Sequence, residues 1–486
     1  MTWGFYGRHE QLKLLKDILT RKRWFFAKVT GRRRIGKTTL IQQGLQAVQD
    51  RKVLYVQVPD SGPAGVLSAV ADALGIFQVD AATAPPPTSL RQLAATIGTL
   101  ARSGYVVVLD EFQYFNRERL SEFCSHLQNE VDQLAANAAA VPGGLMVLGS
   151  IQTEIMALLE DRAAPLYNRT TDELPLTHLD VGSLVELLSA HAEPTPERLL
   201  FLWSLFEGVP KFYRDCYEQG VLGTGRLDLL ERAFFLSSSP LRTEADNWFL
   251  KELHGRYDVV LKYIARHSGC QHGNLVEHVR QLSEETQEQV GGYLKILIDR
   301  YQLIEKRLPI FARERAKKGR YYITDNFLRS WLAALVNPVS AINFVPAATL
   351  VRQANERLMD VEGQALEKLV GQLYAERSRK GVGDFPLTER IRGYWDSGDT
   401  EIDLVAVNEP EQRIRFGSCK RNPERLLSDV AVLDGHVRRF LAANPRFAGW
   451  KIEKASFAPV IPAELRAKLV AAGHVAQDLA DLVIDL

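Results

Sequence analysis

The sequence predicts an α/β protein with a parallel sheet built around a phosphate-binding loop, a helical lid, and further domains after it. The first observation is residues 31–38, which fit Gly-x-x-x-x-Gly-Lys-Ser/Thr between an apolar strand pattern (24–29) and a helix pattern (39–43). The second is the apolar run 105–109, typical of a strand buried on both faces, which ends in two acids. Alternating strands and helices of this kind predict a doubly wound sheet that binds its ligand at the carboxyl ends of the strands.

Composition is that of an ordinary globular protein, with 46% hydrophobic and 24% charged residues among 486. The net charge of +1 gives no global sign of nucleic acid, so such a site must come from local clusters. The 4 cysteines include no Cys-x-x-Cys pair, which argues for a reducing compartment and against a zinc ribbon. No signal-peptide pattern or membrane-length apolar run is present, so we expect a cytoplasmic protein without a membrane partner.

The loop itself predicts the chemistry of the site. Backbone N–H groups of such a loop and of the following helix N-terminus bind anionic phosphate. Lys37 would reach the β- and γ-phosphates, and the Thr38 hydroxyl would ligate Mg²⁺. The residues expected to contact the nucleotide are Gly31, Arg32, Arg33, Arg34, Ile35, Gly36, Lys37, Thr38 and Thr39. The alternative, a basic turn before an ordinary helix, is disfavoured by the flanking strand and helix.

Two acids follow the strand at 105–109. Asp110 would hold Mg²⁺ through water, and Glu111 would act as the base that orients and polarises the attacking water. A strand that ends in two acids is weak evidence alone. Because a phosphate loop lies upstream, the pair predicts a nucleotide-hydrolysing site.

Two further residues, Ser150 and Arg169, are candidates for contact with the γ-phosphate, and for each a purely structural role is equally plausible. Ser150 ends the strand pattern 145–150, which we expect beside the phosphate-loop strand. It would hydrogen-bond the γ-phosphate or the lytic water, or else cap the helix at 151–159. Arg169 is a candidate arginine finger or nucleotide sensor, or else a solvated loop arginine.

Helical patterns flank this core. The turn with Gly7 and Arg8 precedes an amphipathic helix, and such a turn often forms the wall of an adenine pocket; a plain N-terminal helix is the alternative. From 179 to about 250 the pattern is all-helical, with a break at 208–210 that includes Pro210. We expect this segment to form a small lid over the nucleotide.

The middle of the chain predicts a winged helix. Helix patterns at 257–267, 274–282 and 286–301 precede strand patterns at 302–307 and 321–324. The loop between the strands is rich in basic residues, namely Lys306, Arg307, Arg313, Arg315, Lys317, Lys318 and Arg320. Such a wing can follow DNA phosphates. Winged helices also dock proteins, and the presumed recognition helix offers few base-reading side chains, so docking or an inert hinge stays the alternative.

The last domain predicts a nuclease-like α/β fold. A helix near 362–376 precedes strands at 394–395, 401–407 and 413–417 and a helix at 423–442. The candidate site residues are Glu367, Asp403, Ser418 and Lys420. Two carboxylates and a lysine could hold Mg²⁺ and activate water, but Ser418 stands where the second strand carboxylate is needed. We therefore favour a nuclease fold kept for nucleic-acid or partner contact over weak metal-dependent cleavage.

Several of these motifs together resemble the archaeal-type ATPases of the STAND group, which are related to the AAA+ ATPases. The matching segments are 5–8, 31–38, 109–113, 148–150, 165–169 and 208–210. The resemblance implies that the nucleotide is ATP with Mg²⁺, that Asp110 and Glu111 are the Walker B pair, and that Pro210 belongs to a lid motif near the nucleotide. It also implies that Arg169 matches the family's arginine. Residues 363–367, 401–405 and 416–420 resemble the PD-(D/E)xK nuclease-like domain that ends many of these proteins.

The expected organisation is a P-loop ATPase core (1–178), a helical lid (179–250), a winged helix (251–336) and a nuclease-like domain (347–486). The expected function is an ATP-hydrolysing switch that binds DNA through the last two domains. The alternatives are an ATP-dependent DNA nuclease in defence or mobile-element biology and an ATP-gated signalling scaffold without DNA. A homo-oligomer is compatible with either, since Arg169 could act in its own subunit or in the next.

Overall fold

The computed structural model describes residues 2–48, 50–149, 152–244, 256–282, 287–313, 316–396 and 398–486. The chain forms two compact units: the N-terminal unit is Arg8–His178, and the C-terminal unit combines the residues up to Gly7 with Leu179–Leu486. The domain limit expected at 178 lies at this junction, and the later limits fall inside the C-terminal unit. All of the cysteines are free. No helix in the described ranges has the length and apolarity to cross a bilayer.

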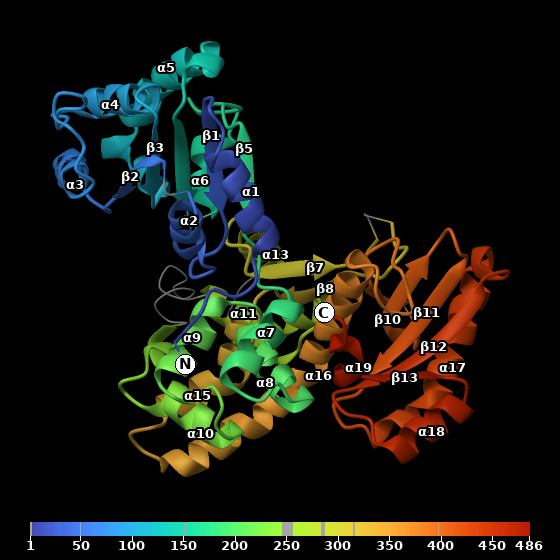
Figure 1. The fold of residues 1–486 in the computed structure, drawn as a ribbon. Coiled ribbons are helices and arrows are strands. Elements are labelled where there is room, and N and C mark those ends of the chain that lie inside the picture. Colours follow the sequence, from blue (N-terminus) through green and yellow to red (C-terminus); the bar gives the residue numbers. More distant parts are fainter. Residues whose placement is uncertain are drawn as a thin grey trace. The chain divides into compact units, whose positions relative to one another are not determined.

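The N-terminal unit contains the expected parallel sheet, in the order β2-β3-β4-β1-β5 (Figure 1). The strands are β1 (Phe25–Thr30), β2 (Lys52–Gln57), β3 (Tyr105–Asp110), β4 (Gly144–Gly149) and β5 (Asp172–Pro175). Strand β4 lies beside the phosphate-loop strand β1, with Phe25 opposite Gly144 and Thr30 opposite Gly149, which confirms the expected neighbour. The central strands are buried and mostly apolar because both faces of the sheet are covered, and the buried Lys28 of β1 pairs with Glu160 at 2.7 Å.

Helices surround this sheet. They are α1 (His9–Leu19), α2 (Lys37–Gln46), α3 (Pro63–Ile76), α4 (Leu90–Arg102), α5 (Glu122–Ala136) and α6 (Gln152–Leu159). The apolar sides of α3, α4 and α5 share one core with Phe26, Val107 and Val147 of the sheet. Alternation along the strands sends these side chains to one face, so the period-2 pattern decides which helices each strand contacts.

The C-terminal unit begins with a helical part, as the sequence predicts for residues after 179. Its helices are α7 (Val181–His191), α8 (Pro196–Phe206), α9 (Pro210–Glu218) and α10 (Arg226–Leu230). Stacked rings of Phe206, Phe212, Phe234 and Phe327 fill its interior, with the Phe212 and Phe327 centroids 4.6 Å apart. Pro210 occupies the first turn of α9, where its fixed φ and missing N–H cost nothing.

Three helices and a small antiparallel sheet follow. They are α11 (Arg256–Arg266), α12 (His272–Leu282) and α13 (Gln287–Asp299), with β6 (Cys270–Gln271), β7 (Ile304–Arg307) and β8 (Arg320–Ile323) in the order β6-β8-β7. The expected hairpin is present, and β6 adds a third strand that the sequence pattern does not reveal. The helical segment after it consists of α14 (Asn326–Ser330), the turn Trp331–Leu335 and α15 (Val336–Ser340).

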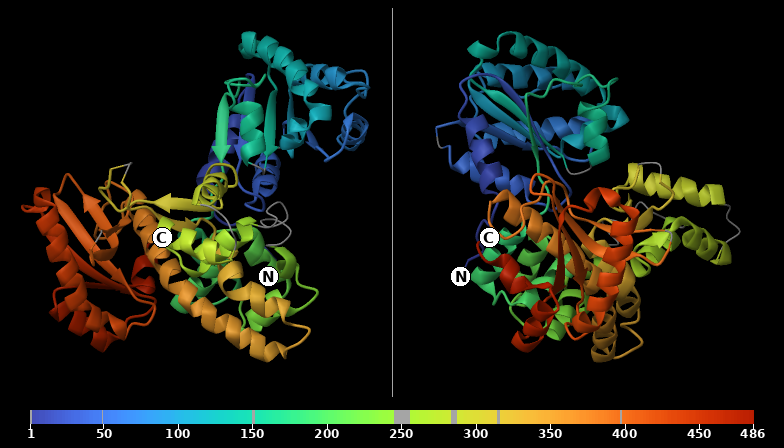
Figure 2. Two further views of the ribbon diagram at one scale, coloured as in Figure 1. Left: turned by 180° about the vertical axis from the view of Figure 1, so that it is seen from behind. Right: turned by 90° about the vertical axis from the view of Figure 1, so that its right-hand side faces the viewer.

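A long helix, α16 (Ala347–Arg379), leads into a five-stranded mixed sheet of order β13-β12-β11-β10-β9. The other elements are β9 (Arg392–Trp395), β10 (Glu401–Asn408), β11 (Arg413–Cys419), α17 (Arg425–Ala443), β12 (Lys451–Ala458), α18 (Ala463–Ala471), β13 (Val475–Asp478) and α19 (Leu479–Val483). Helices α16 and α17 lie on opposite faces of this sheet (Figure 1, Figure 2). On β11, Arg415 accordingly contacts Tyr374 of α16, and the Phe416 ring packs edge-to-face against Phe440 of α17.

The expected start of this helix near residue 362 is wrong, because α16 begins at Ala347. Its added turns are held by Leu350, Val351, Ala354 and Leu358, all buried at helical spacing. The two prolines just before them obscured this pattern in the sequence.

The loop between β7 and β8 packs against the C-terminal sheet. The Ile310 N–H donates to the carbonyl of Gly393 on edge strand β9 at 2.9 Å, and the Ile310 side chain is 1% exposed. Ile310 belongs to the core formed by β10, β11 and α17, and the neighbouring Phe311 ring lies 5.2 Å from that of Phe447. The loop expected to form the wing is therefore anchored by its apolar first half.

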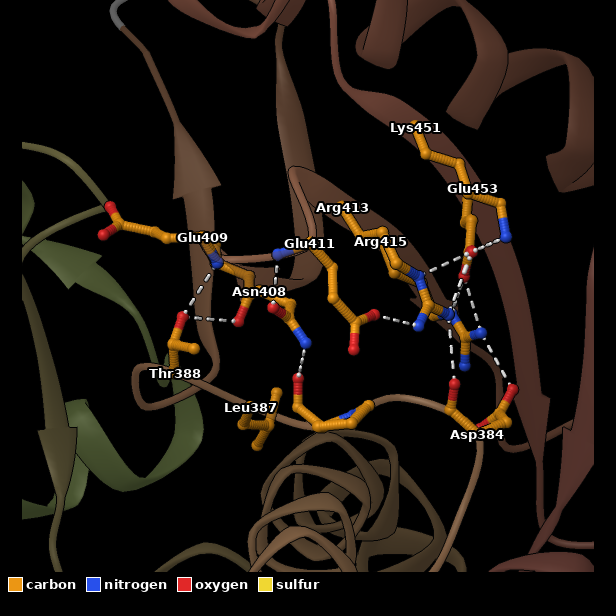
Figure 3. Close-up of polar contacts among 12 residues, drawn as sticks. Asp384, Leu387, Thr388, Asn408, Glu409, Glu411, Arg413, Arg415, Lys451 and Glu453 are labelled. Atoms are coloured by element: carbon orange, nitrogen blue, oxygen red, sulfur yellow. Dashed lines mark hydrogen bonds and ion pairs between the residues drawn. The ribbon is translucent and has the colours of Figure 1, made fainter.

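A charged network at one end of this sheet is neutralised internally (Figure 3). Arg415, only 4% exposed, pairs with Asp384 at 2.8 Å and with Glu453 at 2.7 Å. Arg413 pairs with Glu411 at 2.7 Å and also with Glu453 at 3.1 Å. The buried Arg415 and the half-buried Arg413 both have carboxylate partners, so their charges are compensated within the fold.

Candidate functional site

The phosphate-binding loop follows β1 and leads directly into α2. Gly31 (φ 148°) and Gly36 (φ 93°) have the positive φ that a side chain resists, and a Cβ on Gly31 would lie 2.4 Å from the carbonyl oxygen of Leu176. Arg34 also has a positive φ of 67°. The Lys37 ammonium donates to the carbonyls of Gly31 at 2.8 Å and Arg32 at 3.0 Å, so its side chain folds back over the loop. Arg33 and Thr39 are exposed.

Lys37 lies in an environment that disfavours its charge. Burial lowers the pKa of Lys37 to about 8, although the nearby Glu111 and Asp110 carboxylates favour the ammonium. The two carboxylates offset only part of the cost of burying the Lys37 ammonium. Bound phosphate oxygens would supply the remaining negative charge.

The two expected metal-binding side chains meet. Thr38 Oγ1 donates to Asp110 Oδ2 at 2.8 Å, and the Tyr55 hydroxyl of β2 donates to the same oxygen. The other oxygen, Asp110 Oδ1, accepts the Glu111 N–H at 2.8 Å. A hydroxyl and a carboxylate side by side are the oxygen donors that Mg²⁺ prefers, so this pair fits the expected ion. Tyr55 was not foreseen, because only the strand order brings β2 beside β3.

Glu111 directly follows β3 and has a left-handed backbone conformation. Its φ of 59° turns the chain sharply after the strand, and its carboxylate accepts a hydrogen bond from the Gln113 amide. Positive φ in a non-glycine residue is uncommon and often marks a functional position. Gln113 is a second residue that the sequence left without a role, although it lies in a segment carrying the family resemblance.

Arg8 is also brought to the loop. Its guanidinium donates to the carbonyl of Ile35 at 3.3 Å and to that of Thr177, so it links the start of α1 to the loop and to the chain after β5. Arg32 contacts His178 Nε2 at 2.9 Å. Gly7 has a different explanation, since a Cβ there would lie 2.2 Å from Ser183 Oγ of α7, within the C-terminal unit.

Arg169 lies away from the loop in the N-terminal unit. It precedes β5 near the amino ends of the strands, where Thr171 bonds to Phe26, whereas the phosphate loop begins at the carboxyl end of β1. Its guanidinium forms a two-point ion pair with Asp132 of α5, at 2.7 and 3.0 Å. The structure thus gives no support to Arg169 as a sensor in its own subunit. Ser150 and Arg315 lie outside the described residues, and Pro210 belongs to the other unit.

The four residues expected to form a nuclease-like site come together in the C-terminal unit, joined by one that the sequence did not reveal. Asp403 Oδ2 accepts from the Cys419 N–H at 2.8 Å and lies 3.4 Å from Lys420 Nζ. Ser418 donates to Asp429 of α17, which also lies 3.5 Å from Lys420 Nζ. Asp429 could not be foreseen because nothing in the sequence ties that turn of α17 to strand β11.

Glu367 of α16 completes this cluster electrostatically. Burial and the Asp403 carboxylate raise the pKa of Glu367, while Lys420 and Arg329 act in the opposite direction. Within the described part of the chain, no group of three or more histidine, cysteine or acidic side chains is placed to hold a metal ion. In this arrangement Asp403, Ser418, Lys420 and Asp429 are hydrogen-bonded or ion-paired with one another, and Glu367 joins them through charge interactions.

The basic loop is partly engaged. Arg320 makes a two-point ion pair with Glu401 at 2.6 and 3.1 Å and lies 4.6 Å from the Trp395 ring centroid. Arg307 pairs with Glu305 and stacks 4.3 Å from the Tyr322 centroid. These two arginines serve the fold and are weak candidates for DNA contact. The exposed basic residues of the loop are Lys306, Arg313, Lys317 and Lys318.

Comparisons with known proteins agree with the loop geometry. Residues 24–140 match the family described as AAA domain, and residues 331–428 match a family described as archaea bacterial proteins of unknown function. An uncharacterized protein of Methanocaldococcus jannaschii is 25% identical over 426 residues, covering 86% of this chain and 87% of its own.

Among solved structures, the Walker-type ATPase of Pyrococcus abyssi is similar, with a TM-score of 0.52, 18% identity, and coverage of 68% of this chain and 96% of that one. The ORC2 protein of Aeropyrum pernix gives a TM-score of 0.43 at 14% identity, covering 73% and 94% of the two chains. The N-terminal unit therefore has the fold of P-loop ATPases, and most of it matches the AAA domain family. At 18% identity, the similarity to the Pyrococcus abyssi protein indicates a shared fold only.

Proposed function

We propose that the protein is an ATP-hydrolysing switch in which the nucleotide state of the N-terminal unit controls the C-terminal unit. The observation that carries this is the hydrogen bond between Thr38 and Asp110, with Lys37 and Glu111 beside it, at the carboxyl ends of β1 and β3. This is the arrangement that holds a nucleotide triphosphate and its metal in P-loop proteins.

Each side chain has a distinct task in hydrolysis. Lys37 leaves the Gly31 and Arg32 carbonyls to pair with phosphate oxygens. Thr38 and Asp110 would hold Mg²⁺, which neutralises charge on the phosphates. Glu111 leaves Gln113 to accept the proton of the attacking water, whose oxygen bonds to the γ-phosphorus as the bond to the bridging oxygen breaks.

The test compares Lys37→Ala with Glu111→Gln. Lys37→Ala removes a charged contact and is expected to weaken ATP binding by about 10- to 100-fold. Glu111→Gln keeps the shape of the side chain and should bind ATP normally, while phosphate release falls by about 100-fold or more. Binding is measured by calorimetry and turnover by phosphate release. Unchanged turnover in Glu111→Gln would remove Glu111 from its role as base.

We further propose that the exposed part of the β7–β8 loop contacts DNA phosphates, with α11, α12, α13 and the small sheet acting as a winged helix. In support, Lys317 and Lys318 are exposed, whereas Arg320 is occupied. The double substitution of both lysines to Ala should lower the slope of log affinity against log salt by about 0.9 for each phosphate that the loop no longer neutralises. Lys468→Ala, on α18, serves as the control. A slope insensitive to the loop lysines, or no binding at all, favours a signalling scaffold.

Metal-dependent DNA cleavage remains the second candidate, and Asp429 is the observation that favours it. Its carboxylate lies beside Ser418, where a strand acid is missing. Plasmid is incubated with the protein, ATP, and Mg²⁺ or Mn²⁺. Nicking that disappears in both Asp403→Ala and Asp429→Ala supports a nuclease. Intact plasmid under all conditions supports a nuclease fold kept for binding only.

Arg169 is proposed to act on the site of a neighbouring subunit. It lies away from its own loop, and its Asp132 partner is half exposed, so the pair can be exchanged at an interface. Arg169→Ala and Lys37→Ala proteins are mixed, since the first keeps an intact loop and the second keeps the arginine. ATPase activity above that of either variant alone supports action between subunits, and purely additive activity contradicts it.

A further inference from the structure

We propose that a cavity in the C-terminal unit binds a small phosphate monoester of a hydroxyl-rich molecule, such as a sugar phosphate. The cavity has a volume of about 500 Å³ and lies between the end of α11, the helical segment 326–340 and the middle of α16. This is the size range of small-molecule sites. None of its lining residues belongs to the phosphate loop or to the Asp403 cluster.

Arg329 is the main reason for expecting an anion. It lines the cavity from α14 and is only 9% exposed. Among the residues that the structure describes, its guanidinium has no ion-pair partner, and the buried Nε has no hydrogen-bond acceptor. Burial lowers the pKa of Arg329 to about 10, although the nearby Glu367 carboxylate acts in the opposite direction. The guanidinium is therefore still charged at neutral pH. A buried charge without a paired counterion is costly, so a bound anion is the natural compensation.

The other buried arginines of the described chain are compensated. Arg415 has two carboxylate partners, Asp384 and Glu453, and Arg8 donates to two backbone carbonyls. Arg329 differs from both, although its burial is similar. The difference supports a binding role, because all of these guanidiniums face the same desolvation cost.

The rim of the cavity adds positive charge. Arg266 of α11 and Arg357 of α16 line it and are exposed, and neither has an ion-pair partner among the described residues. The acid in the lining is Asp360. Three arginines and one aspartate leave a formal excess of two positive charges, which matches a phosphate dianion. Guanidinium groups also match phosphate oxygens in pairwise geometry.

A second buried polar atom indicates that the ligand also donates a hydrogen bond. The Gln364 amide Nε2 donates to the Ser268 carbonyl at 3.2 Å, while Oε1 is buried without a donor partner in the described ranges. An acceptor of this kind needs an O–H or N–H. Asn337 and Ser268 add further polar lining.

The lining favours a sugar or polyol over a base. Besides His267, whose ring already stacks on Tyr263 at 4.3 Å, the described lining contains no aromatic side chain. Nucleobases are usually recognised by stacking on such rings, so this cavity suits hydroxyl groups better.

The experiment uses the full chain carrying Lys37→Ala, so that the phosphate loop contributes little binding. Ribose 5-phosphate and glucose 6-phosphate are titrated by calorimetry, and thermal unfolding is recorded in parallel. At least one of them should bind and raise the unfolding temperature, and the unphosphorylated sugars should not. In that background Arg329→Met should lose affinity by about tenfold or more, as should Arg357→Ala at the exposed rim, where the fold is not at risk.

Arg415→Met is the matched control, because it removes an equally buried but fully paired arginine. It should lower the unfolding temperature without ligand, yet leave the ligand-induced shift in place. The proposal is overturned if neither sugar phosphate binds, or if Arg329→Met and Arg357→Ala bind as well as their parent. It is also overturned if only a DNA duplex, and neither sugar phosphate, gives an Arg329-dependent response. These outcomes are independent of ATP hydrolysis, since Lys37 is already removed.

Discussion

At the scale of single residues, the phosphate loop derives its properties from burial as much as from its motif. Lys37 is held by carbonyls of its own loop, and Thr38 and Asp110 are hydrogen-bonded to each other. These contacts hold the site residues together, with the Lys37 ammonium in a poorly solvated position.

The lowered pKa of Lys37 predicts a pH dependence of ATP binding. The ammonium is present below about pH 8 and is lost above it, so ATP affinity should fall as pH rises through that value. The affinity should fall by about tenfold per pH unit above the pKa of Lys37 in the free protein, and it should level off above the pKa of Lys37 in the ATP complex. Calorimetry between pH 7 and pH 10 measures this, with Lys37→Ala as the control that should show no such midpoint. An affinity independent of pH over this range would contradict the assignment.

Gly7 provides a test of a structural role for a residue expected near adenine. Gly7→Ala would place a Cβ at a φ of 62° and within 2.6 Å of Ser183 Cβ, so it should destabilise the C-terminal unit by about 1–3 kcal/mol. Gly363→Ala, in the interior of α16 with open space around it, should instead stabilise by about 1 kcal/mol. Denaturant unfolding of both variants decides, and a neutral Gly7→Ala would show that the contact is easily relieved.

At the scale of elements, the β7–β8 loop shows how one segment can serve two purposes. Its apolar half, Ile310 and Phe311, packs in the core of the C-terminal sheet, and the described residues Arg313, Lys317 and Lys318 of its basic half are exposed. The sequence pattern showed the basic half clearly. The apolar half was hidden, because two hydrophobic residues in a loop have no period to reveal what they pack against.

Ile310→Ala should therefore behave as a core substitution although it lies in a loop. Removing a side chain that is 1% exposed should cost about 2–5 kcal/mol of unfolding free energy. Lys317→Ala in the same loop should change stability by less than about 0.5 kcal/mol. Chemical denaturation compares the two, and similar small effects from both would mean that the loop is not anchored in solution.

At the scale of the whole molecule, the division into two units predicts two unfolding transitions. A nucleotide at 100 times its Kd should raise the unfolding free energy of the N-terminal unit by about 2.7 kcal/mol, and so shift the transition of that unit alone. Calorimetry with and without a slowly hydrolysed ATP analogue measures this, and at the same concentration Lys37→Ala, with its 10- to 100-fold weaker binding, should reduce the shift to about 0.4–1.4 kcal/mol. A single transition in the absence of nucleotide would contradict the independence of the units.

The sequence by itself determined the strand–loop–helix around Gly31–Thr38 and the acids Asp110 and Glu111 at the end of strand β3. These follow from local patterns, since glycine spacing, apolar runs and strand ends act over a few residues.

Only the tertiary structure decided which distant partners these residues have. It showed ion pairs between Arg169 and Asp132 and between Arg320 and Glu401. It also showed hydrogen bonds from Tyr55 to Asp110 and from Ser418 to Asp429. It also left Arg329 buried beside a cavity without a paired counterion. Partners of this kind depend on packing between segments far apart in the chain, and the free energy of a buried charge is set by those partners and by the loss of water, which no local pattern records.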